Sequence, residues 1–122
     1  MIAVMFEVEL KPDEVDTYFE LAHLLKASLI KMPGFISIER FQSLSEPQAS
    51  LSQASKDLPP KPAKVLSLSF WQDEAAVANW RKHTEHNQAQ GLGREKVFDD
   101  YRIRVAHVVR DYGLHRRDEA PK

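Results

Sequence analysis

Apolar residues recur along this chain with two different spacings, and the order in which the spacings follow one another constrains the fold. Alternation at every second residue is typical of a half-buried strand and covers residues 2–10, 35–42, 65–71 and 100–111. Spacing of three to four residues is typical of an amphipathic helix and covers residues 15–29 and 74–90. The resulting order, βαββαβ, predicts an α+β domain with an antiparallel four-stranded sheet and two helices on one face.

The ends of these elements carry their own signals. Pro12 begins the first helix, Pro33-Gly34 ends it, and Asp73 caps the second helix. The Ser-, Gln- and Pro-rich stretch 43–64 is expected to be a long flexible loop. One ferredoxin-like domain over residues 1–113 is therefore predicted, followed by a charged C-terminal tail, 114–122, that is expected to fray.

The face of the sheet that the helices leave uncovered is itself apolar. It is expected to carry Met5 in the first strand, Ile36 and Ile38 (opposite to Phe35 and Phe41) in the second, and Ala106 and Val108 in the fourth. A monomer rarely exposes such a surface, so the pattern predicts a homodimer that forms through the sheet face.

Charged residues on the outer strands allow two interpretations. Glu7 and Glu9 of the first strand can pair with Arg102 and Arg104 of the fourth, which this topology places beside it. Equally, all four can be solvated charges that contribute little to stability.

Composition excludes several classes of protein. Cysteine is absent, which excludes thiol nucleophiles, disulfides and Cys-ligated metals. Lys and Arg total 17 against 18 Asp and Glu, with both signs interspersed, so neither nucleic acid nor a membrane surface is expected as a partner. No apolar run approaches the ~20 residues of a membrane span, and the N-terminal segment has no cationic region or cleavage site of a signal peptide. A cytoplasmic location is expected.

Four motifs give the chain a likeness to a known family. PGFISIERF at 33–41, LSFWQDE at 68–74, WRKHTEH at 80–86 and FDDYRIRV at 98–105 resemble the antibiotic biosynthesis monooxygenase (ABM) domain. This resemblance implies a dimeric α/β barrel with a cavity between helices and sheet in each subunit. It also implies oxygenation of aromatic polyketides without flavin, metal or haem, whereas a sister branch of the family binds and degrades haem.

Oxygenation without a cofactor requires a base that converts the substrate into an electron-rich anion, and histidine suits that role near neutral pH. His83 and His86 are the candidates, since the helical spacing places His83 on the face of Trp80 and His86 on its flank. An ordinary pair of surface histidines is the alternative. Two histidines at this spacing also resemble part of a metal site, but no third ligand is evident, and no metal is predicted.

Four further residues are candidates for binding the substrate. Trp71 and Trp80 either shape the pocket or only pack in the core. Tyr101 and Arg104 are positioned to hold a phenolate or a carboxylate, unless Arg104 instead pairs with a glutamate of the first strand.

The expected function is thus cofactor-independent oxygenation of a small aromatic or quinol-like molecule. A non-catalytic small-ligand-binding or stress-response dimer is an alternative, because one fold serves many functions. A haem-binding or haem-degrading relative is a second alternative. It is disfavoured, since that branch uses an Asn in the first strand and a His ten residues after the helix Trp. Here residues 2–10 contain no Asn, and Gln90 stands at the ligand position.

Overall fold

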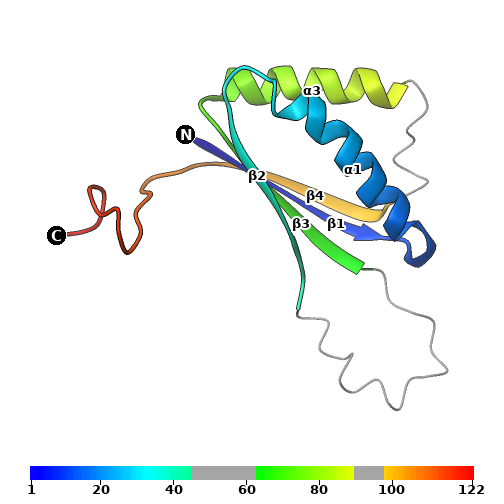
Figure 1. Ribbon diagram of the computed structural model, residues 1–122, viewed down its shortest axis with the longest axis horizontal. Helices are drawn as coiled ribbons and strands as arrows, with labels where there is room; N and C mark the ends of the chain where they lie inside the picture. The colour runs from blue at the N-terminus through cyan, green and yellow to red at the C-terminus, as the bar shows by residue number, and fades with distance from the viewer. Residues whose placement is uncertain (45–62, 90–97) are drawn as a thin grey trace, which may run out of the picture.

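The computed structural model describes residues 1–44, 63–89 and 98–122, and its elements follow the predicted order. They are β1 (Ile2–Leu10), the 3-10 turn η1 (Pro12–Glu14), α1 (Val15–Leu29), β2 (Phe35–Gln42), β3 (Ala63–Trp71), α3 (Glu74–Ala89) and β4 (Phe98–His107), as Figure 1 shows. The sheet order is β2-β3-β1-β4, and every neighbouring pair is antiparallel. This confirms the ferredoxin-like arrangement. Most of the predicted loop, residues 45–62, lies outside the described residues.

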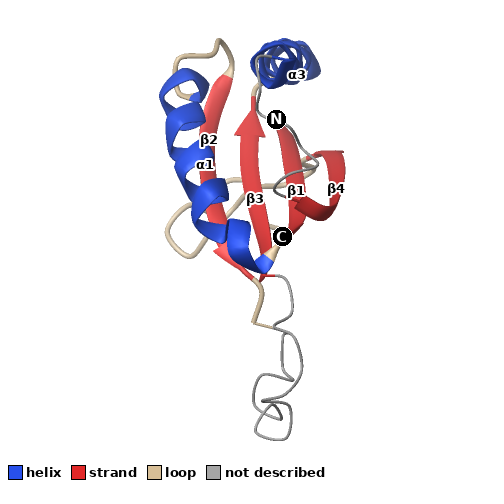
Figure 2. Cartoon of the chain, turned by 90° about the vertical axis from the view of Figure 1, so that its right-hand side faces the viewer, coloured by secondary structure: helices blue, strands red, loops and turns tan. Residues whose placement is uncertain are grey.

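The core lies between one face of the sheet and the two helices. One cluster of buried residues joins Val8, Leu10 and Val65 of the sheet to Tyr18 of α1. A second cluster, at the other end of the strands, joins Ile2 and Trp71 to both helices through Leu29 of α1 and Ala76 of α3. Figure 2 shows α1 toward the β2 side of the sheet and β4 at the opposite edge.

The turn after α1 fixes the start of α3. Gly34 has a φ of +82°, which a glycine adopts without a steric penalty. Its carbonyl accepts a hydrogen bond from the backbone N–H of Gln72 at 2.8 Å, and a Cβ at this position would lie 2.6 Å from the Cβ of Ala76. The side chain of Asp73 caps α3, as the sequence predicts, by accepting a hydrogen bond from the Ala76 N–H at 2.9 Å.

A β-bulge changes the faces expected for β2. Phe35 pairs with Trp71, but Ser37 already pairs with Phe70, so the register shifts between Phe35 and Ser37. Ile38 therefore packs in the same core cluster as Phe35. The predicted opposition of Ile36 and Ile38 to Phe35 is wrong for Ile38, because simple alternation does not allow for the extra residue.

The uncovered face of the sheet is apolar at its centre. β3 directs Leu66, Leu68 and Phe70 to this face, and Met5 of β1 lies beside Leu68. At the edge of the apolar region Arg104 Nη1 lies 3.2 Å from Glu7 Oε2, which confirms one of the predicted cross-strand ion pairs. Both side chains are partly exposed, so this pair contributes at most about 1 kcal/mol.

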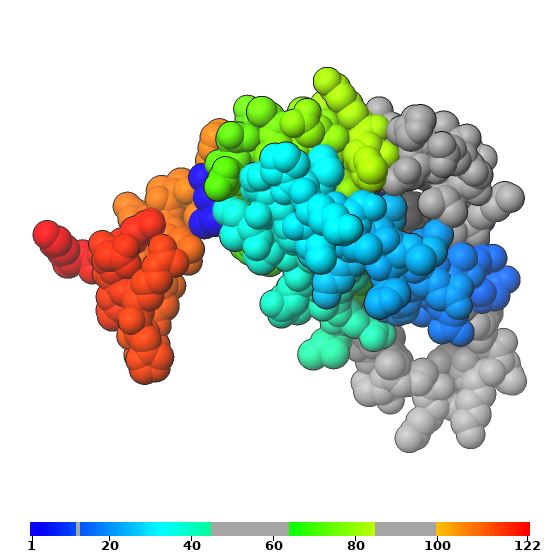
Figure 3. All heavy atoms as spheres, turned by 45° about the horizontal axis from the view of Figure 1, so that its top comes forward, coloured from blue at the N-terminus to red at the C-terminus, as the bar shows by residue number. Residues whose placement is uncertain are grey.

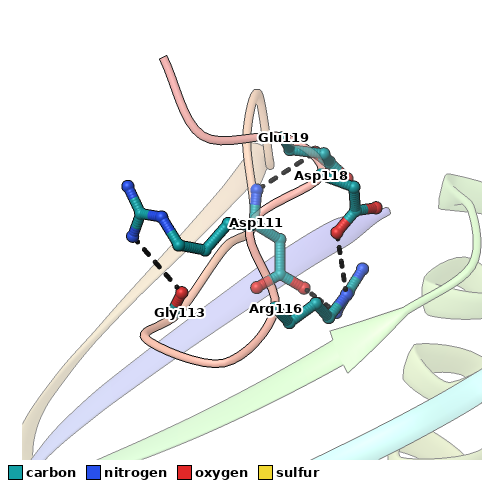
Figure 4. Close-up of polar contacts among 6 residues, drawn as sticks. Asp111, Gly113, Arg116, Asp118 and Glu119 are labelled. Atoms are coloured by element: carbon teal, nitrogen blue, oxygen red, sulfur yellow. Dashed lines mark hydrogen bonds and ion pairs between the residues drawn. The ribbon is translucent and has the colours of Figure 1, made fainter. Parts of the chain in front are cut away.

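The C-terminal segment leaves the body of the domain after β4. The N–H of Val108 donates to the Met1 carbonyl at 3.0 Å and extends the β4–β1 ladder by one residue. The chain then runs away from the sheet and folds into a hook, which stands clear of the body (Figures 1 and 3). Hydrogen bonds join residues of the hook to one another (Figure 4), and the fraying expected of residues 114–122 stays a prediction. In the described part of the chain, no helix is long and apolar enough to cross a bilayer.

Candidate functional site

A row of aromatic rings connects the sheet to α3. The ring centroid of Trp71 lies 5.4 Å from that of Phe35 and 6.3 Å from that of Trp80. Trp80 in turn stacks on the imidazole of His83, with centroids 5.4 Å apart and planes inclined by 26°. Trp71 is 1% exposed, whereas Trp80 and His83 are partly buried. Trp71 therefore supports the row from within the core, and His83 forms its outer end.

The imidazole of His83 has an unused hydrogen-bonding atom. Its Nε2 is buried and has no hydrogen-bond partner among the residues that the structure describes. A buried polar atom without a partner costs about 1–3 kcal/mol, and a ligand that supplies the partner removes this cost. His86 also belongs to α3, but its side chain lies outside the described residues.

Buried hydroxyl groups line the helix-facing side of β3. Tyr18 Oη of α1 lies 3.1 Å from Ser67 Oγ, and Trp71 Nε1 donates to Ser69 Oγ at 2.9 Å. Ser67 pairs with Arg40 of β2 in the sheet register. The Nε of Arg40 is also buried and finds no hydrogen-bond partner in the described part of the chain. Sequence reasoning missed these polar residues, although serines at alternate positions of an apolar strand are a signal for them.

An apolar stripe on β4 adjoins this region. Tyr101, Ile103 and Val105 lie beside Val8, Phe6 and Val4 of β1 in the sheet register and so belong to the helix-facing side. They are 43%, 54% and 50% exposed. The Tyr101 ring lies 5.8 Å from that of Phe6. Val4, which lies beside Val105, and Trp80 both pack against the buried cluster around Trp71, so the Val105 end of the stripe and the aromatic row adjoin the same cluster.

The candidate residues thus fall into two groups. Trp71, Trp80, His83 and Tyr101 all lie on the helix-facing side of the sheet. Arg104 does not join them, because it pairs with Met5 in the register and forms its ion pair with Glu7 on the uncovered face. Among the described residues, no group of three or more His, Cys, Asp or Glu side chains is arranged to hold a metal ion.

A shallow hollow on the outer surface of α1 is separate from this site. It is lined by Asp16, Phe19, Glu20, His23 and Leu24. The helical spacing of apolar residues predicts Phe19 on the buried face of α1, but it is 45% exposed, so that prediction is wrong. The helix instead buries Tyr18, Ala22 and Leu29.

Comparison with known proteins gives a consistent result. Residues 1–53 match the family model described as antibiotic biosynthesis monooxygenase. The jasmonate monooxygenase ABM of Pyricularia oryzae is 38% identical over 109 residues, which are 89% of this chain but only 44% of that protein. This chain therefore spans less than half of that relative's length. The uncharacterized protein YqjZ of Bacillus subtilis is 29% identical over 108 residues, 88% of this chain and 79% of that protein.

Solved structures share the fold at low sequence identity. A crystal structure of an antibiotic biosynthesis monooxygenase superposes with a TM-score of 0.64 at 17% identity, covering 89% of this chain and 99% of that one. Rv0793 of Mycobacterium tuberculosis gives 0.67 at 11% identity, covering 92% and 98%. A mutant of MhuD with manganese protoporphyrin IX bound gives 0.65 at 12% identity, covering 93% and 99%.

Proposed function

Because this chain is related in sequence and fold to the antibiotic biosynthesis monooxygenase family, we propose that it oxygenates a small aromatic or quinol-like molecule without a cofactor. The name of its 38%-identical relative, a jasmonate monooxygenase, supports the oxygenation of a small organic molecule. The observation that carries the proposal is the buried, unpartnered Nε2 of His83 at the end of an aromatic row.

In the proposed reaction His83 accepts a proton from the substrate. Deprotonation of an anthrone-like compound at its methylene carbon yields an anion that is electron-rich enough to reduce dioxygen directly. That carbon loses two hydrogens and gains one oxygen atom, and the other oxygen atom leaves as water. The protein then has to bind the planar substrate, hold it against the base and exclude bulk water.

The neighbouring side chains suit a planar substrate. Trp80 holds the imidazole of His83 by stacking, which fixes the orientation of the base. Tyr101 offers a hydroxyl group and an aromatic ring at the edge of the apolar stripe, where a phenolate is able to bind. Trp71, which is fully buried, supports Trp80 without touching the substrate.

Oxygen consumption with a panel of anthrones and hydroquinones tests the base. General-base catalysis contributes about 10²–10⁴-fold, so His83→Gln is expected to lower kcat/KM by that factor. His23→Gln is the matched control, because His23 is an exposed histidine on the outer surface of α1. His86→Gln tests the second candidate for the base. Unchanged rates in both the His83 and His86 variants would show that neither residue is the base.

We also propose that the active form is a homodimer that buries the uncovered sheet face. Leu66, Leu68 and Phe70 form the centre of this face and support the proposal. Leu68→Lys places a charge there and is expected to give monomers in sedimentation velocity. Leu24→Lys, which alters an exposed leucine of α1, is expected to leave the dimer intact. A monomeric wild-type protein at micromolar concentration would contradict this part of the proposal.

The residues of this chain do not fit the haem-degrading branch. β1 contains no Asn, and Gln90 replaces the ligating His ten residues after Trp80. Titration with hemin is therefore expected to produce no Soret shift. Tight binding of aromatic ligands without oxygen consumption would instead favour a non-catalytic binding module.

A further inference from the structure

The C-terminal segment from Val109 to Lys122, hereafter the arm, is ordered by contacts with itself. Asp111 N–H donates to Glu119 Oε2 at 3.1 Å, and Arg116 reaches both Asp111 and Asp118 with N–O distances of 3.3 and 3.6 Å (Figure 4). The N–H of Gly113 donates to the Arg116 carbonyl at 2.7 Å. Within the described ranges 1–44, 63–89 and 98–122, every hydrogen bond and ion pair given for the arm joins it to itself, and the last backbone hydrogen bond to the body is that of Val108.

Such an arm needs a surface to stabilise it. Ordering each residue costs about 1–2 kcal/mol of backbone entropy, whereas exposed hydrogen bonds and ion pairs contribute about 1 kcal/mol or less each. The arm also exposes apolar side chains, since Val109 is 80% exposed, Leu114 is 79% exposed and Tyr112 is 45% exposed. These apolar side chains stay in contact with water, so they contribute little hydrophobic stabilisation until another surface covers them.

The β4 stripe formed by Tyr101, Ile103 and Val105 has the matching character. It is apolar, about half exposed, and lies on an edge strand, where an added segment meets no neighbouring strand of the described residues on the outer side. In Figures 1 and 3 the arm of the same chain extends away from the body, so this stripe and the arm do not meet within one copy.

We propose that the arm of one copy docks on the β4 stripe of a second copy and closes the outer side of its substrate site. The inference rests on the homodimer of the proposed function. The arm continues from β4, an edge strand of the sheet through which that dimer forms, and the stripe of the second copy lies on its own β4 edge strand, so the arm reaches the stripe by passing round that edge to the helix-facing side. A twofold axis then gives both copies the same arrangement, with Val109, Tyr112 and Leu114 of the arm covering the partner's stripe.

The absence of cysteine from the sequence makes cross-linking a direct test. A chain carrying Leu114→Cys and a chain carrying Ile103→Cys are co-expressed with tags of different size and treated with a short bismaleimide. Docking raises the effective concentration of the two thiols to about 1 mM, so with protein at about 10 μM the mixed product is expected to form about a hundredfold faster than by random collision. Leu24→Cys replaces Ile103→Cys in the matched control, because Leu24 is exposed on α1.

Three outcomes overturn the proposal and separate it from the proposed function. Equal cross-linking to the Ile103 and Leu24 positions in an intact dimer would refute docking on the stripe while leaving the sheet-face dimer in place. Efficient cross-linking within a single chain that carries both Ile103→Cys and Leu114→Cys would show that the arm folds back on its own copy. Sedimentation of the wild-type chain as a monomer would refute the dimer together with the arm exchange, whereas loss of oxygenase activity alone would affect neither.

Discussion

Replacement of Gly34 by alanine tests how α3, which carries Trp80 and His83, is held on the sheet. The added methyl group has two separate costs. A φ of +82° is unfavourable for alanine by roughly 1–2 kcal/mol, of which about 0.4–1 kcal/mol is offset by the lower entropy of the unfolded chain. The new Cβ also lies 2.6 Å from the Cβ of Ala76, and relief of such overpacking typically costs about 1–3 kcal/mol.

The two costs are separable in a double-mutant cycle. Gly34→Ala alone is expected to lower the free energy of unfolding by about 2–4 kcal/mol. For a domain of this size, each kcal/mol lost lowers Tm by roughly 4 °C. In an Ala76→Gly background the steric conflict is absent, so the same substitution is expected to cost only about 1 kcal/mol. Urea unfolding followed by tryptophan fluorescence measures all four proteins, since Trp71 and Trp80 lie in and beside the core.

The same cycle has a functional readout. A methyl group at Gly34 displaces the first turn of α3, so oxygen consumption by Gly34→Ala is expected to fall and to recover in the double variant. An equal loss of stability in both backgrounds would refute the reasoning, because it would mean that the backbone conformation, and not the close approach of Ala76, is what requires glycine here.

Three smaller predictions concern single contacts. Tyr18→Phe removes the hydrogen bond to Ser67 and is expected to cost about 1 kcal/mol in urea unfolding; no loss would mean that the buried hydroxyls do not stabilise the core. Asp73→Ala removes the cap of α3 and is expected to cost about 1 kcal/mol, whereas Asp73→Asn keeps the acceptor and is expected to be nearly neutral in the same assay. Glu7→Gln breaks the pair with Arg104 and is expected to cost less than about 1 kcal/mol, a difference that disappears in 1 M salt; a larger, salt-independent loss would contradict a solvent-screened pair.

The order of elements was predictable because each one is long enough to repeat its period several times. Apolar residues at every second position of β1, from Ile2 to Leu10, define a strand, and Asp73 marks the start of α3 independently of the apolar pattern. That β4 lies beside β1 follows from the topology, which made cross-strand ion pairs one of two interpretations of these charges, and the structure forms the pair between Glu7 and Arg104.

The β-bulge in β2, the width of the buried stripe on α1 and the face on which Arg104 lies were not predictable from the sequence. The bulge between Phe35 and Ser37 returns Ile38 to the side of Phe35, and alternation contains no signal for such an insertion. Phe19 has helical spacing but lies on the outer side of α1, because the buried stripe of that helix is narrow. Likewise, the sequence offered Arg104 as a substrate contact, and only the register shows that it lies on the other face.

The distribution of side chains on β3 links the fold to the proposed site and dimer. In a sheet with one covered and one wet face, apolar residues are expected under the helices and polar residues opposite them. β3 combines Ser67 and Ser69 under the helices with Leu66, Leu68 and Phe70 on the other side. The buried serines are tolerated only because Tyr18 and Trp71 form hydrogen bonds with them. The leucines lie on a face that a monomer leaves in contact with water, and this contact is unfavourable. A sheet with this inverted pattern is stable in water when a second copy covers the apolar side, and the helix side then remains the part of the molecule where buried polar groups can meet a ligand.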